Sequence, residues 1–290
     1  MTHKLRYLSL PWRPGWGLRP SAGAGSMAAV PSPTLSQPAP FGIVEEVPAE
    51  GPPSLVHPGW RSAFPWVIQG TTTRGGGQDP FDLGLFSDAS APGAVLERWD
   101  QVRRDVDVPR SVHARQLHGS EVRFHGPGDA GLHLADACDG HATAVAGVLL
   151  TVTTADCVPV FMVDPARRVV ALLHAGWRGA AGGILEAGVA VMKARAGSRA
   201  ADLHVHLGPS ICGACYEVGP EVFSALGLPE PAHPTPLDLR QALAHRAVAV
   251  GVPEDRVSIS AHCTLCNRDV LFSHRGGDRA RQVGFLGMRE

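Results

Sequence analysis

The stretch AGVLLTVTTADCVPVFMVDPARRVVALLHAG, residues 146–176, contains a long strand-forming run that is broken near Ala155 and Asp156. The turn signal DPAR follows at residues 164–167 and leads into a second apolar run. Two apolar runs joined by a short turn of this kind predict a β-hairpin. The centre of the fold is therefore expected to contain antiparallel strands.

Strands and helices alternate along the chain around this hairpin. Further strands are predicted over residues 66–74, 112–124 with an interruption at Gly119, 202–211 and 256–264. Helices are predicted over residues 91–106, 182–197, 219–227 and 238–251. Alternation combined with hairpins favours a mixed α/β sandwich over a purely parallel, doubly wound sheet.

Composition narrows the class of protein. The chain has 290 residues, of which 44% are hydrophobic, enough for one sizeable core or at most two small domains. Its formal net charge of −1 provides no global field toward nucleic acid or an anionic membrane. No window approaches eighteen consecutive apolar residues, so no membrane-spanning helix is expected. Six cysteines without a convincing signal peptide predict reduced thiols and a cytoplasmic protein.

The first sixty residues differ from the rest of the chain. Segments such as PSPTLSQPAP and PAEGPPSLVHPGW are rich in Pro, Ser and Ala and lack periodicity. This composition predicts that residues 1–60 are disordered, or in part an over-extended start with Met27 or a later residue as the true beginning. One ordered domain is expected over residues 61–290.

Three predicted strand ends carry metal-ligand side chains, namely His118, Cys157 and His174. Two imidazoles and a thiolate suit Zn²⁺ or copper, and three protein ligands with one open position are typical of a catalytic site. The separations of 39 and 17 residues form no compact motif, so a small buried cysteine with two incidental histidines is the alternative. The neighbouring Gly, Asp and Arg residues favour the metal site.

Two arginines are candidates for binding an oxyanion such as phosphate. Arg178 follows His174 by four residues, where a helix is predicted to start, and a guanidinium at a helix N-terminus suits phosphate. Arg74 precedes three glycines that would let the backbone approach a ligand. A surface arginine and a flexible loop are the alternatives, because the glycine spacing is not that of a P-loop.

The cysteines allow other interpretations. Cys157 could be a hydrolase nucleophile with His174 or His118 as its base, although Asp156, adjacent on the strand, would point away from it. Two CxxC pairs, Cys212/Cys215 and Cys263/Cys266, could form a Cys₄ zinc site, but 47 intervening residues far exceed a zinc ribbon, so a shared site is not expected.

Two metalloenzyme classes are excluded or disfavoured. The classical zinc deaminase signature requires H-x-E, which is absent from the chain. A multicopper laccase needs several H-x-H pairs and a Cys-His cluster, and the pair His204/His206 does not supply that set.

Several motifs stand in the order found in one known family. The chain resembles the laccase-domain family, also called the multicopper polyphenol oxidoreductase or peptidoglycan editing factor family, over roughly residues 65–287. The motifs are TTTRGGG, RQLHGSEV, DACDGHAT, TTADCVPVFMVD, LLHAGWRGAAGGILE, LGPSICGACYEVGPEV, CTLCNRDVLFSHR and RARQVGFL. Three positions depart from the family pattern: Asp82 replaces a usual asparagine, and His274 and Gly276 replace a usual tyrosine and second arginine.

The resemblance implies a single-domain α/β/β/α sandwich with mixed sheets. It also implies purine nucleoside phosphorylase activity toward adenosine, inosine and methylthioadenosine, together with adenosine deaminase activity. By the matching motifs, His118, Cys157 and His174 would then hold zinc, or copper in some preparations. Independently of the resemblance, the residues expected to serve catalysis are Arg178 and Arg74, as candidates for binding the phosphate charge, and Cys157. The expected partners are a purine nucleoside and phosphate, and the chain is expected to be a monomer or a homodimer. A Cys/His hydrolase in peptidoglycan precursor editing and a copper polyphenol oxidase remain the alternatives.

Overall fold

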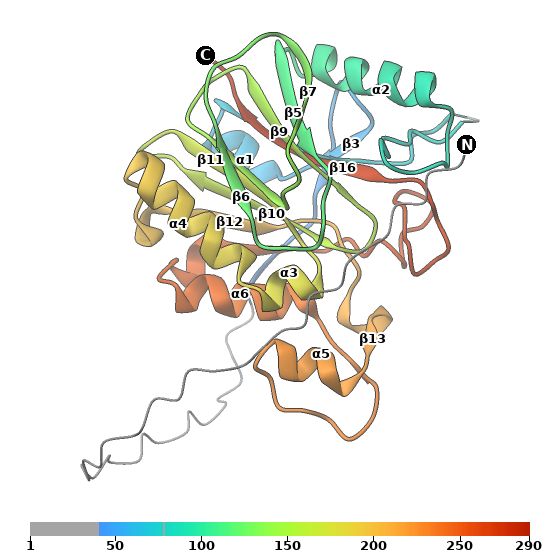
Figure 1. Ribbon diagram of the computed structural model, residues 1–290, viewed down its shortest axis with the longest axis vertical. Coiled ribbons are helices and arrows are strands. Elements are labelled where there is room, and N and C mark those ends of the chain that lie inside the picture. Colours follow the sequence, from blue (N-terminus) through green and yellow to red (C-terminus); the bar gives the residue numbers. More distant parts are fainter. Residues whose placement is uncertain (1–40, 78) are drawn as a thin grey trace, which may run out of the picture. The chain divides into compact units, whose positions relative to one another are not determined.

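Two seven-stranded mixed β-sheets stack face to face between layers of helices in a computed structural model, which describes residues 41–77 and 79–290 (Figure 1). The first sheet contains, in spatial order, β1 (Gly42–Val44), β15 (Val257–Ser260), β12 (His204–Leu207), β10 (Val158–Asp164), β11 (Val169–Ala175), β8 (Gly140–Thr143) and β6 (Val122–His125). The second contains β2 (Val47–Pro48), β3 (Ser54–Val56), β4 (Val67–Thr72), β16 (Gln282–Met288), β9 (Val148–Thr154), β5 (Arg110–Ala114) and β7 (Gly131–Ala135). The predicted α/β/β/α sandwich is therefore confirmed.

Helices and short elements complete the described fold. The helices are α1 (Pro58–Ala63), α2 (Pro92–Asp105), α3 (Trp177–Ala181), α4 (Ile184–Ala196), α5 (Pro220–Ala225) and α6 (Leu239–Ala249). Single 3₁₀ turns are η1 (Ala200–Asp202), η2 (Gly213–Cys215) and η3 (Glu254–Arg256), and β13 (Glu217–Val218) pairs with β14 (Thr235–Pro236). The four predicted helices correspond to α2, α4, α5 and α6.

The strand-forming run at 146–176 crosses between the two sheets. Its first half is β9 in the second sheet and its second half is β10 in the first, so the break at 155–157 is where the chain changes sheet. The hairpin is confirmed, because β10 pairs antiparallel with β11 from Val158 opposite Ala175 to Asp164 opposite Val169. The interruption at Gly119 is a second crossover, because β5 and β6 belong to different sheets.

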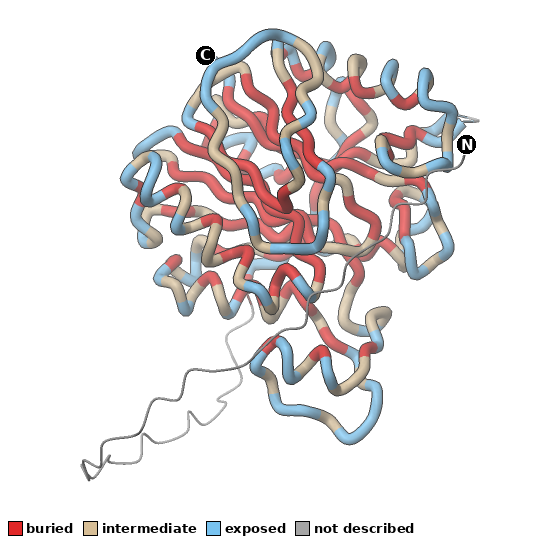
Figure 2. The backbone as a smooth tube through the Cα atoms, viewed as in Figure 1, coloured by how far each residue is buried: buried red, intermediate tan, exposed pale blue. Residues whose placement is uncertain are grey.

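Three apolar layers hold the sandwich together, and the side-chain alternation of the strands explains them. In β10, Val160 and Met162 pack toward the helical layer that includes α4 and α6, whereas Phe161 and Val163 pack between the sheets. In β9, Leu150 faces the other sheet while Leu149 packs with Trp99 of α2. Both faces of these strands are buried, and Figure 2 shows the buried residues concentrated in the central strands.

The expectation of disorder is wrong for residues 41–60. β1 pairs in parallel with β15, β3 pairs with β4, and α1 starts at Pro58. Glu46 is buried and accepts hydrogen bonds from His206 Nε2 at 2.9 Å and from Ser260 Oγ at 2.8 Å. These short strands show no periodicity in sequence. They are held in place by pairing with distant segments, which a local pattern does not indicate. The remainder of the expected disordered segment, residues 1–40, lies outside the described residues.

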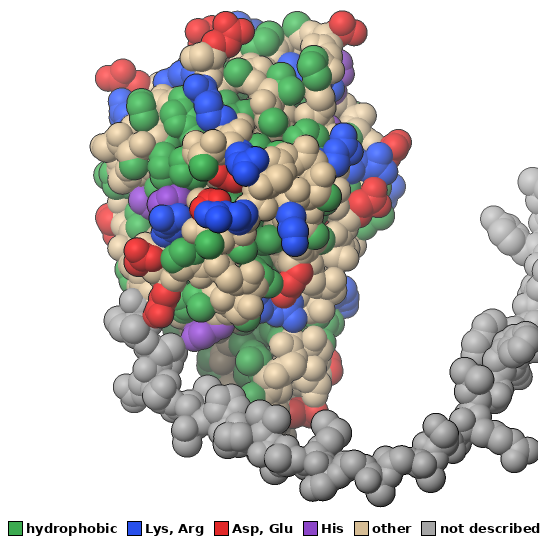
Figure 3. All heavy atoms as spheres, turned by 90° about the vertical axis from the view of Figure 1, so that its left-hand side faces the viewer, with side chains coloured by type: hydrophobic (Ala, Val, Ile, Leu, Met, Phe, Trp, Pro, Cys, Tyr) green, Lys and Arg blue, Asp and Glu red, His purple; other side chains and the backbone are tan. Residues whose placement is uncertain are grey.

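The surface carries no dominant charge on the side that Figure 3 presents. Lysine and arginine side chains are interspersed there with aspartate and glutamate, as the near-zero net charge leads one to expect. Among the helices of the described residues, none has both the length and the apolar character needed to cross a membrane.

Candidate metal centre

His118, Cys157 and His174 lie together, with their ligand atoms all within 4.8 Å of one another. His118 Nε2 is 3.8 Å from Cys157 Sγ. The His118 side is exposed, Cys157 is half-buried and His174 is buried. The cluster therefore has a closed side at His174 and an open side toward solvent, where a ligand could enter.

The two sheet crossovers explain why these residues meet. Cys157 directly follows the crossover between β9 and β10, and the pairing of Val158 with Ala175 places it beside His174 at the end of β11. His118 lies in the crossover between β5 and β6. His118 and Asp156 both have a positive φ, 59° and 90°, a conformation that non-glycine residues adopt only when the surrounding structure enforces it.

Asp139 enforces the turn at His118. Its carboxylate accepts hydrogen bonds from the backbone N–H groups of Leu117, His118 and Gly119 at 3.0, 2.9 and 2.8 Å. Its Oδ1 also lies 2.9 Å from His174 Nδ1. A carboxylate that accepts the Nδ1 proton orients the imidazole and leaves Nε2 free for a metal.

Two glycines of the HAGWRG stretch make close approaches that any side chain would block. A Cβ on Gly176 would lie 2.8 Å from His118 Cδ2 and 3.1 Å from Cys157 Sγ. A Cβ on Gly179 would lie 2.8 Å from the carbonyl oxygen of Gly119. The turn after β11 therefore packs directly on the His118 turn, and glycine is required where the two meet.

The charges at the centre favour a thiolate and an imidazolium when no metal is bound. Burial raises the pKa of the Cys157 thiol, but the nearby His174 charge and hydrogen bonds from His118 and His174 outweigh burial and lower that pKa to about 6. Burial lowers the pKa of His174, but Cys157 and Asp139 raise it to about 9. A deprotonated thiol is the form that binds a metal or attacks an electrophile.

Asp156 connects the centre to the C-terminal segments. Its Oδ1 accepts hydrogen bonds from Thr264 Oγ1 at 2.6 Å and from Ser273 Oγ at 2.8 Å, and its Oδ2 accepts one from the Arg275 backbone N–H at 2.6 Å. Asp156 therefore has a structural role of its own, although it was not expected to orient Cys157. It holds two distant segments against the turn that carries Cys157.

The two predicted arginines have different surroundings. Arg178 is exposed, and its guanidinium carbon lies 4.4 Å from the centroid of the Trp177 ring. Arg178 is the second residue of α3, which has only five residues, so its own charge rather than a helix dipole is its main means of attracting an anion. Arg74 instead pairs with Asp278 at 2.7 Å and stacks on Phe272. Arg74 reaches the centre only indirectly, because Asp278 also accepts from Ser273, which donates to Asp156.

Asp139, Tyr216 and Arg275 lie at the centre although the sequence analysis assigns them no individual role. Tyr216 lies within electrostatic range of Cys157 and Arg178, and the Arg275 guanidinium carbon is 5.3 Å from the centroid of its ring. Asp139 lies in the motif DACDGHAT, which was the available signal for it.

Comparison with known proteins identifies the family of the chain. The family described as multi-copper polyphenol oxidoreductase laccase matches residues 68–289. The chain belongs to this family. Purine nucleoside phosphorylase YlmD from Geobacillus stearothermophilus is 34% identical over 257 residues, which cover 78% of this chain and 92% of that protein. Adenosine deaminase RL5 from an unknown prokaryotic organism is 35% identical over 183 residues, 59% of this chain and 70% of that protein.

Solved structures of the family share the fold. The crystal structure of YlmD from Geobacillus stearothermophilus has a TM-score of 0.76 and 31% sequence identity, covering 87% of this chain and all of that one. The Bacillus licheniformis protein YfiH has a TM-score of 0.74 and 28% identity, covering 82% of this chain and 97% of that one.

Asp82, His274 and Gly276, the three departures from the family pattern, lie in different parts of the structure. Asp82 is buried, and its Oδ1 accepts from the backbone N–H groups of Gly84 and Arg281, both at 2.9 Å. His274 is exposed, and Gly276 donates its N–H to Ser273 Oγ at 3.0 Å. Asp82 therefore holds a loop, whereas His274 and Gly276 flank Arg275 beside the centre.

Proposed function

We propose that this protein is a metal-dependent purine nucleoside phosphorylase that also deaminates adenosine. It would convert adenosine, inosine and methylthioadenosine to the free base and the corresponding sugar 1-phosphate, which is ribose 1-phosphate for adenosine and inosine. The observation that carries the proposal is the convergence of His118, Cys157 and His174 at one open site. The relatives named purine nucleoside phosphorylase and adenosine deaminase support the choice of substrate.

The donor set fits a catalytic zinc ion, with copper as the second choice. Two imidazoles and a thiolate are borderline and soft ligands, and three protein ligands leave a coordination position for water or substrate. A bound metal would supply a Lewis acid that lowers the pKa of a coordinated water. Asp139 would orient His174 as a metal ligand, because its carboxylate binds Nδ1 and leaves Nε2 of the ring to face the metal.

The positive groups on the open side would hold phosphate beside the sugar. Arg178 is exposed and its guanidinium is oriented by the Trp177 ring, so it is available for a bidentate contact with a phosphate. Placing phosphate against the ribose lowers the barrier mainly through orientation and charge. Arg74 would contribute less direct charge, because Asp278 already neutralises it, and would mainly hold the segment that carries Ser273.

Product analysis tests this function. Metal-loaded protein is mixed with adenosine, with and without phosphate, and the products are separated. Free adenine and ribose 1-phosphate that form only with phosphate are the expected result for phosphorolysis. Inosine in both mixtures is the expected result for deamination. Absence of all three products with an occupied metal site would contradict the proposal.

Variants separate the roles of the residues. Cys157→Ala should abolish metal binding at His118 and His174 and, with it, both activities. Arg178→Ala should lower phosphorolysis by about 100-fold while metal content stays unchanged, because the positive charge that would hold the attacking phosphate is lost. Arg195→Ala is the matched control, since Arg195 is also exposed and stacks on an aromatic ring, that of Phe124, at 5.0 Å. Unchanged phosphorolysis in Arg178→Ala would remove Arg178 from the assignment.

A Cys/His hydrolase is the second candidate, and a specific observation favours it. The arrangement is that of a nucleophilic triad: the thiol of Cys157 lies next to the base His174, which in turn is oriented by the carboxylate of Asp139. The two functions differ in their need for metal. Cleavage of an amide or ester substrate that survives complete metal removal and passes through an acylated Cys157 would favour the hydrolase.

A further inference from the structure

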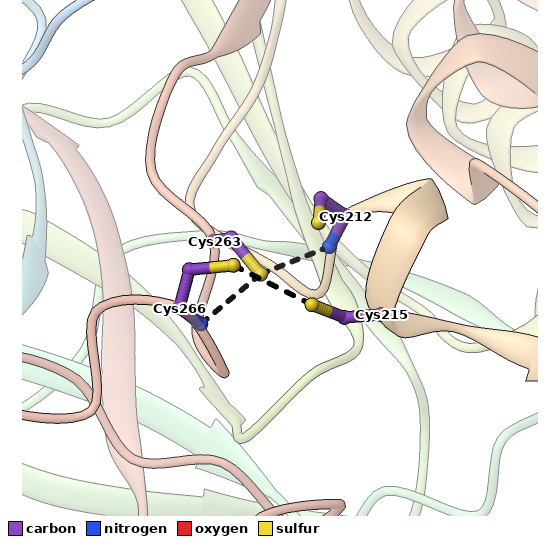
Figure 4. A group of neighbouring side chains, drawn as sticks. All are labelled: Cys212, Cys215, Cys263 and Cys266. Atoms are coloured by element: carbon purple, nitrogen blue, oxygen red, sulfur yellow. Dashed lines mark hydrogen bonds between the residues drawn. The ribbon is translucent and has the colours of Figure 1, made fainter.

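The four cysteines of the two CxxC pairs come together in space, contrary to the expectation from their separation in sequence. The Sγ atoms of Cys212, Cys215, Cys263 and Cys266 all lie within 4.8 Å of one another, and the Sγ atoms of Cys215 and Cys266 are 3.4 Å apart (Figure 4). Zn–S bonds of about 2.3 Å in a tetrahedron place neighbouring sulfurs about 3.8 Å apart. The cluster therefore has the dimensions of a tetrathiolate site.

Long-range pairing explains this convergence. The chain leaves β12 and β15, which pair in parallel, and Ser210 and Cys263 continue that pairing as a single bridge. The η2 turn then brings Cys215 back toward Cys212, and the turn that follows Cys263 brings Cys266 back toward Cys263. Gly213 allows η2 to pack closely, because a Cβ there would lie 2.9 Å from Asp238 Cβ.

The surroundings of Cys263 favour a negatively charged sulfur at that position. Cys263 Sγ accepts hydrogen bonds from the backbone N–H groups of Cys212 at 3.2 Å and Cys266 at 3.4 Å. N–H donors of this kind stabilise a thiolate. The buried guanidinium of Arg240 also lies within electrostatic range of Cys212 and Cys263, but it is paired with Asp238 at 2.7 Å.

We propose that Cys212, Cys215, Cys263 and Cys266 bind a structural Zn²⁺ ion, separate from the candidate metal centre. Each thiol releases its proton to solvent on binding, so one Zn²⁺ replaces four protons and no oxidant is needed. Four protein ligands complete the tetrahedral coordination and leave no position for substrate. This distinguishes the four-cysteine site from the three-ligand centre at His118, Cys157 and His174.

The ion would fasten the two segments that support the candidate metal centre. Ile211 donates its N–H to the carbonyl oxygen of Asp156 at 3.1 Å, and Thr264 donates its hydroxyl to the Asp156 carboxylate at 2.6 Å. Each contact lies one residue from a cysteine of the cluster. A metal that joins Cys212 to Cys263 thus fixes both segments against the residue that precedes Cys157.

Metal content of anaerobically purified protein tests the proposal. Inductively coupled plasma mass spectrometry should find two zinc ions per chain in the wild type. One ion should remain in His118→Ala/Cys157→Ala, which removes the candidate metal centre, and one in Cys215→Ser/Cys266→Ser. Combining all four substitutions should leave none. Cys138→Ser is the control, because Cys138 belongs to neither cluster, and it should keep two ions.

Cobalt provides a readout that does not depend on folding of the Cys215→Ser/Cys266→Ser variant. In His118→Ala/Cys157→Ala, one equivalent of Co²⁺ should give the intense visible and charge-transfer bands of tetrahedral thiolate coordination. Absence of these bands, or loss of all zinc from this variant, would overturn the proposal. A disulfide between any two of the four cysteines in protein prepared under anaerobic conditions would also overturn it. Iron instead of zinc would keep the site and overturn the choice of metal.

Discussion

The carboxylate of Asp139 lies 2.9 Å from His174 Nδ1 and, through its other hydrogen bonds, also holds the turn that carries His118. One side chain thereby positions two of the three candidate ligands, which come from different crossovers and strands. The geometry of the centre therefore depends on Asp139 as well as on the ligands themselves.

Asp139→Asn should weaken metal binding by roughly 10–100-fold, the usual effect of losing a carboxylate that orients a ligating histidine. The Asp139 carboxylate accepts from three backbone N–H groups and from His174 Nδ1. An asparagine amide has only one accepting oxygen, and its own N–H groups would face some of these donors. Competition with a chromophoric chelator measures the change in affinity. Asp136→Asn is the control, since Asp136 is an exposed neighbour paired with Arg123. Equal affinities in both variants would contradict the role given to Asp139.

Gly176→Ala should displace His118 and lower metal affinity by roughly tenfold, because the added Cβ would lie 2.8 Å from the His118 ring. The backbone conformation at Gly176 suits alanine, so the effect would arise from the contact rather than from φ. Gly93→Ala in α2 is the matched control, with open space around its Cβ. We expect the control to keep full metal affinity, as measured by isothermal titration calorimetry.

Alkylation of Cys157 in metal-free protein should depend on pH with a midpoint near 6. The pKa of its thiol is lowered to about 6 because His174 and the hydrogen bonds of both histidines outweigh burial. The reactive thiolate therefore dominates above that pH and is lost as the pH falls through it. Mass spectrometry of iodoacetamide-treated peptides resolves Cys157 from the other cysteines. A midpoint near 9 would show that the histidines do not stabilise the thiolate, and bound metal should protect the residue.

The protein should lose stability as the pH falls from 7 to 4, and His113 should account for part of the loss. Burial lowers the pKa of His113 to about 4, so between 6.5 and 4 the unfolded chain takes up a proton that the folded chain resists. A shift of this size corresponds to about 3 kcal/mol of unfolding free energy at pH 4. Urea unfolding at both pH values measures it.

A substitution pair isolates the contribution of His113. His113→Asn should show a smaller difference in unfolding free energy between pH 7 and pH 4 than the wild type, since it removes the group that resists protonation. His233→Asn, at an exposed position, should keep the wild-type difference. A His113→Asn variant with undiminished pH dependence would show that other groups carry the effect.

Local sequence patterns were sufficient for several elements. The hairpin of β10 and β11 was predicted from two apolar runs joined by a turn signal, and α2 from apolar residues at helical spacing. The short strands before Pro58 and the central strand β16 were missed. Pairing with remote segments stabilises them, and only residues 282–286 of β16 stood in a family motif.

The sequence by itself determined which residues carry ligand chemistry, and motif order indicated the family. Only the tertiary structure decided which of those residues meet. The side chain types of His118, Cys157 and His174 are local facts, but their convergence depends on two crossovers between sheets and on Asp139. The same holds for the four cysteines, since parallel pairing of β12 with β15 brings together pairs that are 47 residues apart. Periodicity reports burial within one element, whereas a binding site depends on contacts between elements that no local pattern encodes.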